Sequence, residues 1–128
     1  MKTLKFRVYI KELKKLIYIG DEPSDTYIMF TENGVWFVYH TFYGSHDLIA
    51  SSEHDDILMQ FTGLQDKNGK DIYEGDIVQW FHVTKGVSVV QFSDGYFHPQ
   101  GYGNSFLRLG SIEITGNIHE NPELNQDA

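Results

Sequence analysis

Short runs of β-branched and aromatic residues, separated by turn-forming pairs, constrain the fold of this chain more than any other feature. Segment 27–39 carries Asn33-Gly34 between two such runs, and segment 87–98 carries Asp94-Gly95 in the same position. A pair of this kind between β-prone runs is the strongest short-range signal of a β-hairpin. Many short strands at close spacing predict a mainly β fold.

The hairpin at Asn33-Gly34 is apolar on both sides. A two-residue turn would place Phe30 opposite Phe37, with large apolar side chains on both faces of the hairpin. A hairpin of this kind is covered on both faces, either by the rest of the fold or by another subunit. We therefore expect an interface at the following side chains: Trp36, Phe37 and Tyr39.

The N-terminal segment alternates between apolar and polar residues. In segment 5–10, Phe6, Val8 and Ile10 share one face, which is the period of a half-buried strand. We expect a hairpin formed by this run and residues 16–20, with a single helix through 9–17 as the alternative. Segment 44–56 is polar and acidic, and is predicted to be a short helical turn or a loop.

The C-terminal half contains further β-prone runs at 57–61, 76–83, 87–98 and 111–118. The Asp94-Gly95 turn would place Phe92 opposite Phe97. We expect one domain over residues 1–128, with a small SH3-like β-barrel in the C-terminal half (57–121), an N-terminal β-hairpin layer (1–50) and a frayed tail (122–128).

Charge is divided unevenly along the chain. The net charge is −8, and residues 1–20 carry six basic residues against one acidic residue, a local +5, which leaves −13 for residues 21–128. Protein–DNA affinity depends largely on neutralisation of phosphates by Lys and Arg, so nucleic acid is not an expected partner. The alternative is a nucleic-acid-associated factor of replication or transcription that uses a basic N-terminal ribbon of Lys2, Lys5, Arg7, Lys11, Lys14 and Lys15.

The stretch "FTGLQDKNGKDIYEGDIV" (61–78) has the composition of a loop corner. Gly63, Gly69 and Gly75 recur every six residues. Gly69 lies in a turn that tolerates left-handed conformations, and Gly75 lies where the loop turns sharply into a strand. Asp76 can accept hydrogen bonds from nearby backbone N–H groups. The local chemistry therefore predicts a structural corner and not a catalytic loop.

This stretch, together with "GNIHENPELN" (116–125), resembles two sequence blocks of the YopX-type family of phage and prophage proteins. Near the N-terminus, Phe6 and Arg7 also match the family, whereas Val8 and Tyr9 depart from it and Leu16 stands where methionine is common. The resemblance covers nearly the whole chain. It implies a mainly β fold with an SH3-like element and supplies no established activity or catalytic residues. The motif residues are Gly63, Asp66, Gly69, Ile72, Glu74, Gly75, Asp76, Gly116, Asn117, Asn121 and Pro122.

No pattern of residues points to catalysis, a cofactor or a metal. His40, His46 and His54 lack the spacing that places two metal ligands together, and the chain has no cysteine. No apolar run is long enough to span a membrane, and the N-terminus lacks the apolar core of a signal peptide. We expect a non-enzymatic cytoplasmic protein without cofactor, which forms a homo-oligomer or binds a phage or host protein.

Overall fold

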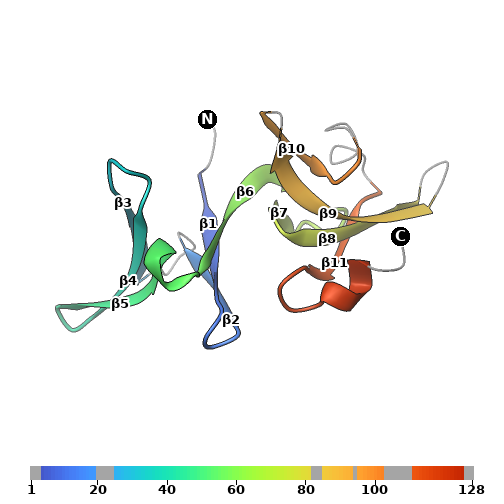
Figure 1. Cartoon of the computed structure of the whole chain (residues 1–128). Coiled ribbons are helices and arrows are strands. Elements are labelled where there is room, and N and C mark those ends of the chain that lie inside the picture. The colour runs from blue at the N-terminus through green and yellow to red at the C-terminus, as the bar shows by residue number, and fades with distance from the viewer. Residues whose placement is uncertain (1–3, 20–24, 82–84, 94, 103–110, 126–128) are drawn as a thin grey trace. The chain divides into compact units, whose positions relative to one another are not determined.

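The computed structural model describes residues 4–19, 25–81, 85–93, 95–102 and 111–125 (Figure 1). The chain divides into two compact units where one domain was predicted. The N-terminal unit is Lys5–Gln60, and the C-terminal unit is Phe61–Ala128 together with Met1–Leu4. Each unit has its own cluster of buried apolar side chains, which is why the division falls between them.

The N-terminal unit contains two antiparallel sheets and a 3₁₀ helix. In the first sheet, β1 pairs with β2 on one side and with the first residues of β6 on the other. The second sheet has the strand order β3-β4-β5. The elements are β1 (Phe6–Ile10), β2 (Lys15–Ile19), β3 (Thr26–Phe30), β4 (Trp36–Phe42), β5 (Ser45–Ser51), η1 (Ser52–His54) and β6 (Ile57–Gln65). The predicted N-terminal hairpin is confirmed, and the helix through 9–17 is wrong.

Alternating residues of both sheets form the core of the N-terminal unit. Half-buried side chains such as Phe6, Ile28 and Leu58 pack around its fully buried members. The buried members are Val8, Ile10, Ile19, Trp36, Val38 and Ala50. Every element of this core lies within residues 5–60, so the unit buries its apolar surface with its own strands.

The β3–β4 hairpin has a different register from the one predicted. Phe30 pairs with Trp36, and Met29 pairs with Phe37. The loop has three residues, because the Thr31 N–H donates to the Val35 carbonyl at 2.8 Å and Gly34 adopts a left-handed conformation (φ 79°). A turn followed by one left-handed residue is the usual three-residue hairpin loop. One extra loop residue moves each β4 side chain by one partner along β3.

Segment 44–56 was predicted to be a loop or helical turn, and most of it is a strand. β5 pairs with β4 from Phe42↔Ser45 to Phe37↔Ser51, and only Ser52–His54 form a 3₁₀ turn. β5 is an edge strand of its sheet, where polar side chains can face solvent while the backbone completes the ladder. Its polarity therefore concealed a strand.

The C-terminal unit is also antiparallel. Its main sheet has the strand order β10-β9-β8-β11, and β7 pairs with the second half of β6. The elements are β7 (Asp71–Tyr73), β8 (Asp76–Phe81), β9 (Lys85–Ser93), β10 (Tyr96–Pro99), β11 (Glu113–Asn117) and η3 (Pro122–Asn125). The predicted pairing of Phe92 with Phe97 is confirmed, and their ring centroids lie 4.9 Å apart.

The core of the C-terminal unit is formed by Ile72, Val78, Trp80, Val90 and Ile112, with Leu64, Phe97 and Ile114 packed against it. Trp80 is 2% exposed and pairs with Gly86 on β9. A Cβ atom at Gly86 would collide with the Trp80 ring, so the strand needs glycine there.

The end of the chain departs from the prediction at its tail. β11 contains a bulge between Ile114 and Gly116. Residues Pro122–Asn125 form a 3₁₀ helix where a frayed tail was predicted, because the Asn121 N–H donates to the Asn117 carbonyl at 2.8 Å and anchors the helix start.

The mainly β class is confirmed. The C-terminal strands form a curled sheet in Figure 1. Closure of this sheet into an SH3-like barrel stays a prediction, since the strand order leaves β10 and β11 as the ends of the sheet in the described part of the chain.

Candidate functional site

Asp66 holds the turn between β6 and β7 and joins it to β11. Its carboxylate accepts hydrogen bonds from the N–H groups of Asn68 (2.8 Å), Lys70 (3.0 Å) and Ile114 (3.0 Å). The first two close the turn in which Gly69 is left-handed (φ 80°), and the third crosses 48 residues of sequence. Asp66 therefore anchors a local turn to a distant strand.

Burial by itself raises the pKa of Asp66, but the hydrogen bonds from Ile114, Lys70 and Asn68 outweigh it. With the charge of Lys70 they hold the pKa of this carboxyl below its ordinary value. The ionised form of Asp66 is the one that the fold stabilises.

The corner at Gly75 is fixed by backbone and side-chain hydrogen bonds. Gly75 is left-handed (φ 85°), its N–H donates to Val90 at 2.8 Å and its carbonyl accepts from Ile118 at 2.8 Å. Asp76 is 3% exposed and accepts from the Tyr73 N–H at 2.8 Å. The preceding Glu74 is half-buried. This is the corner that the sequence predicted.

The C-terminal motif block closes the same corner. Asn117 pairs with Asp76 and Gly116 with Ile77. The Asn117 side chain accepts from the N–H groups of His119 (3.1 Å) and Glu120 (2.9 Å) and donates to the Glu120 carboxylate (2.7 Å).

Asn121 returns a bond to the same block, because its side chain accepts from the Asn117 N–H at 3.3 Å. A Cβ atom at Gly116 would lie 2.5 Å from the Asn121 side-chain oxygen, so this close approach requires glycine. Pro122 begins η3.

The motif residues thus have structural roles. Gly63 is left-handed (φ 89°) and Ile72 is fully buried in the core. The acceptors of Asp66, Asp76 and Asn117 face backbone N–H groups, and this explains why these residue types stand there. The two sequence blocks meet at one corner although about 40 residues separate them.

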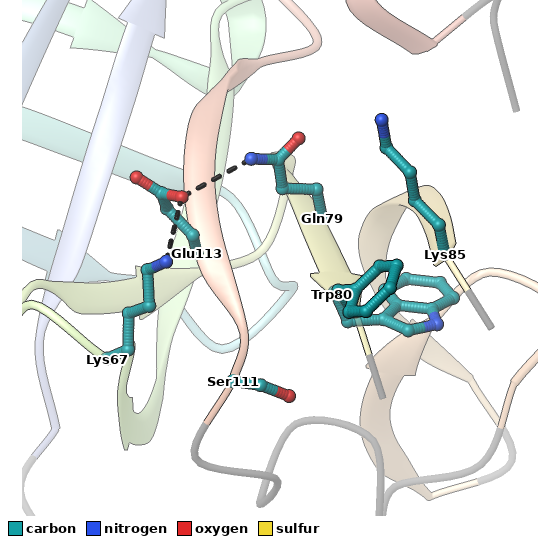
Figure 2. Close-up of a pocket in the computed structure, with 7 residues that line it drawn as sticks. Lys67, Gln79, Trp80, Lys85, Ser111 and Glu113 are labelled. Atoms are coloured by element: carbon teal, nitrogen blue, oxygen red, sulfur yellow. Dashed lines mark hydrogen bonds and ion pairs between the residues drawn. The ribbon is translucent and has the colours of Figure 1, made fainter. Parts of the chain in front are cut away.

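A cavity of about 140 Å³ is lined by residues of β8, β9, the β6–β7 turn and the start of the β11 segment (Figure 2). The register brings its residues together, since Gln79 pairs with Glu113 and Phe81 with Lys85. Its lining residues are Lys67, Gln79, Trp80, Phe81, Lys85, Ser111 and Glu113. None of these lining positions was predicted from the sequence as a site, because only the strand register collects them.

Glu113 is bound on two sides in this cavity. Its carboxylate accepts from the Gln79 side chain at 3.3 Å and forms an ion pair with Lys67 at 3.3 Å. The bond from Gln79, and then the bond and charge of Lys67, lower the pKa of Glu113. Figure 2 shows Glu113 between these two partners, with Lys85 on the other side of Gln79.

A second surface lies on the side of the β3-β4-β5 sheet that faces away from the N-terminal core. Tyr27 stacks on Tyr39 with ring centroids 5.5 Å apart, and Phe37 lies 6.4 Å from Tyr39. Met29 pairs with Phe37, and Leu48 pairs with Tyr39. The side chains of Met29 and Leu48 are 54% and 45% exposed. We call these five residues the aromatic face.

The structure separates the three predicted interface residues. Trp36 is 9% exposed and belongs to the N-terminal core, whereas Phe37 and Tyr39 are half-buried on the aromatic face. The cause is strand alternation, which turns Trp36 and Val38 into the core and Phe37 and Tyr39 to the opposite face. Trp36 was therefore assigned to the wrong surface.

The predicted basic ribbon is also divided. Arg7 is 2% exposed; its guanidinium donates to the Tyr18 hydroxyl at 3.4 Å and lies 5.9 Å from the centre of that ring. Lys11, Lys14 and Lys15 are exposed around the β1–β2 turn, and Lys5 is half-buried. Lys2 lies outside the described residues.

The histidines hold other partners. The His46 ring lies 3.0 Å from the Tyr27 hydroxyl, and the His98 ring lies 2.6 Å from the Ser93 hydroxyl. Within the described residues, no group of three or more His, Cys, Asp or Glu side chains is arranged to hold a metal ion. In the same residues no helix has the length and apolar character needed to cross a membrane.

These features define a small antiparallel β protein of two units, with its sequence motifs at the corner of the second. The profile of the YopX protein family matches residues 5–125, and the chain belongs to this family.

The chain is also similar to solved structures. Protein yopX from Bacillus subtilis is 26% identical with a TM-score of 0.77, and the match covers 98% of this chain and 100% of that chain. Protein EF1440 from Enterococcus faecalis shares the fold at 24% identity with a TM-score of 0.66, covering 97% and 99%. The comparison with curated proteins found no match.

Proposed function

We propose that this chain is a non-enzymatic accessory protein of a phage or prophage that self-associates through the aromatic face. The observation that carries the proposal is the outer surface of the β3-β4-β5 sheet, where Met29 and Leu48 are exposed beside the stacked pair Tyr27–Tyr39 and the neighbouring Phe37 ring. Contiguous exposed apolar surface of this kind is typical of protein-interaction sites. Aromatic residues and Met are enriched in the buried centres of such interfaces.

The occupant we propose is a second copy of the chain. The five residues of the aromatic face carry no formal charge in a protein of net charge −8, so two copies can meet there without placing acids against acids. Elsewhere, the exposed lysines around the β1–β2 turn and the acidic remainder of the chain favour contacts between copies. Closed symmetric dimers are the commonest product of a self-complementary patch.

The side-chain chemistry supports a role without catalysis. The motif carboxylates Asp66 and Asp76 accept hydrogen bonds from backbone N–H groups of the fold, and Glu113 is engaged by Lys67 and Gln79. Carboxyls used in this way stabilise corners and strands.

Sedimentation equilibrium of the full chain at tens of micromolar tests the proposal. We expect the wild type to exceed the 14.8 kDa mass of one chain, and the double variant Met29→Glu/Leu48→Glu to sediment as a monomer. Leu13→Glu is the matched control, because Leu13 is 64% exposed in the same unit but lies at the β1–β2 turn. It should leave the assembly intact.

A monomeric wild type at that concentration would overturn the proposal, as would a double variant that remains assembled. Circular dichroism of the variants verifies that the β structure is kept. An interface with this role should bury more than about 1,000 Å² in total.

The second candidate is a nucleic-acid-associated factor. The exposed lysines Lys11, Lys14 and Lys15 around one turn favour it. The burial of Arg7 removes one of the six predicted cations from the surface. Binding of single-stranded DNA that weakens steeply with salt would promote this candidate.

A further inference from the structure

Cations of the C-terminal half gather at the cavity of Figure 2. Residues 61–128 contain only four basic residues, Lys67, Lys70, Lys85 and Arg108, against nine acidic ones. Two of these four basic residues, Lys67 and Lys85, line the cavity, together with one acidic residue, Glu113. The cavity is therefore locally cationic in an acidic chain, which is the arrangement that attracts an anion.

The two lysines differ in their partners. Lys67 pairs with Glu113 at 3.3 Å, and Glu113 also accepts a hydrogen bond from Gln79, so these three side chains satisfy one another. Within the described part of the chain, the side-chain ammonium group of Lys85 forms no hydrogen bond or ion pair. The cavity thus keeps one ammonium group available after its internal pairing is complete.

Apolar surface stands beside this ammonium group. Phe81 is directly opposite Lys85 in the β8–β9 ladder, so both side chains leave the same face of the sheet. Phe81 is 72% exposed, although it lies in the strand whose neighbours Val78 and Trp80 are buried. A ligand that contacts both residues needs an anionic end and an apolar stem.

We propose that this cavity binds one carboxylate group of a peptide, with Lys85 as its ion-pair partner and Phe81 against the aliphatic part. The volume of about 140 Å³ fits a group of that size, because a cavity of about 150 Å³ holds a benzene molecule. A carboxylate suits a site with one free lysine, whereas phosphate recognition favours the bidentate fork of arginine.

Two sources could supply the carboxylate, an acidic side chain or the C-terminus of a peptide. Amide chemical shifts of the full chain, followed in a titration, distinguish them with two probes: N-acetylglutamate α-amide for the side chain and N-acetylglycine for the terminus. N-acetylglutamine α-amide is the uncharged control. We expect saturable shifts at Phe81 and Lys85 with millimolar affinity, and none with the control.

Binding by one probe alone assigns the source, and binding by both shows that the carboxylate is the recognised group. Lys85→Gln should weaken binding about fivefold to tenfold, as expected for loss of one charge-assisted hydrogen bond. Lys70→Gln is the matched control, since Lys70 is an exposed lysine of the same unit that does not line the cavity.

Three results would overturn the proposal: no saturable shift with either acid, equal binding of the uncharged control, or equal loss of affinity in both lysine variants. Lys85 is exposed, so its replacement leaves the core intact and the amide spectrum verifies this. The test concerns the C-terminal unit only, and its outcome leaves the self-association proposed for the aromatic face unaffected.

Discussion

The two units of this protein are both antiparallel β structures, but different interactions set their geometry. In the C-terminal unit, the side chains of Asp66, Asp76 and Asn117 accept hydrogen bonds from backbone N–H groups at its turns. In the N-terminal unit, apolar side chains dominate both sides of the β3–β4 hairpin. Hydrogen bonds are directional and therefore fix the geometry of corners. Apolar packing is not directional and depends on the area buried, so the strand register of the hairpin is set by the length of its loop.

The largest effect is expected from Trp36→Ala in the N-terminal core. Loss of this 9% exposed side chain should lower the free energy of unfolding of the N-terminal unit by about 3–5 kcal/mol. Trp80 is then the only tryptophan left, so its fluorescence reports on the C-terminal unit during denaturation, while amide exchange reports on residues 5–60. Leu13→Ala is the surface control. A loss below about 1 kcal/mol would contradict the placement of Trp36 in the core.

Asp66→Ala should have the largest polar effect. It leaves three backbone N–H groups without their acceptor, one of them in β11, and should cost about 2–4 kcal/mol of unfolding free energy. Urea denaturation measures it. Asp71→Asn is the control, because the Asp71 carboxylate accepts from Gln65 at an exposed position, and should cost no more than about 0.5 kcal/mol. Equal losses in both variants would show that Asp66 is not an anchor.

Gly75→Val should destabilise the corner by about 1–3 kcal/mol, because a β-branched residue is strained at a φ of 85°. Gly75→Asn is the matched variant, since asparagine tolerates the left-handed region and should cost less. Thermal unfolding of both variants compares them. A valine variant that melts like the wild type would refute the role of backbone conformation at this corner.

The pH dependence of stability should also differ between wild type and Asp66→Asn. The pKa of Asp66 is lowered in the folded state, so its contribution is complete above the unfolded value of about 4 and is lost as the pH falls through the folded value. Wild type should therefore lose stability in acid more steeply than Asp66→Asn. Urea denaturation at a series of acidic pH values tests this, and parallel curves would contradict it.

The smallest effect is expected with DNA. We expect no measurable binding to random duplex DNA at about 0.15 M salt, where screening limits charge interactions to about 8 Å and the chain carries a net charge of −8. Fluorescence anisotropy is the measurement. Micromolar binding that is lost in Lys11→Gln/Lys14→Gln would instead assign a function to the β1–β2 turn.

The contrast between the units also explains what the sequence could predict. The left-handed conformation of Gly75 and the pairing of Phe92 with Phe97 have local signals in the sequence, and both were predicted correctly. The β3 partners of Trp36 and Phe37 depend on one additional loop residue, which Asn33-Gly34 did not reveal. Burial of Arg7 depends on its place between β2 and β6, which alternation within β1 cannot indicate.

The candidate sites were harder to predict than the fold. Phe37 and Tyr39 were predicted as surface residues and lie on the aromatic face. The cavity collects side chains from β8, β9, β11 and the β6–β7 turn, and its only local signal is that Phe81 and Lys85 flank a strand connection. Residues that long-range strand pairing brings together are not marked by any regular spacing in the sequence.

The bond between Ile118 and Gly75 has a consequence for the order of folding during synthesis. The β-pairs of the N-terminal unit lie within residues 5–60, so this unit can fold while the remainder of the chain is still being translated. The corner at Gly75 closes only when Ile118 arrives, after the strands β6 to β11 have left the ribosome. The unit that carries the aromatic face therefore emerges before the C-terminal corner closes, so the self-association proposed for that face does not depend on completion of the second unit.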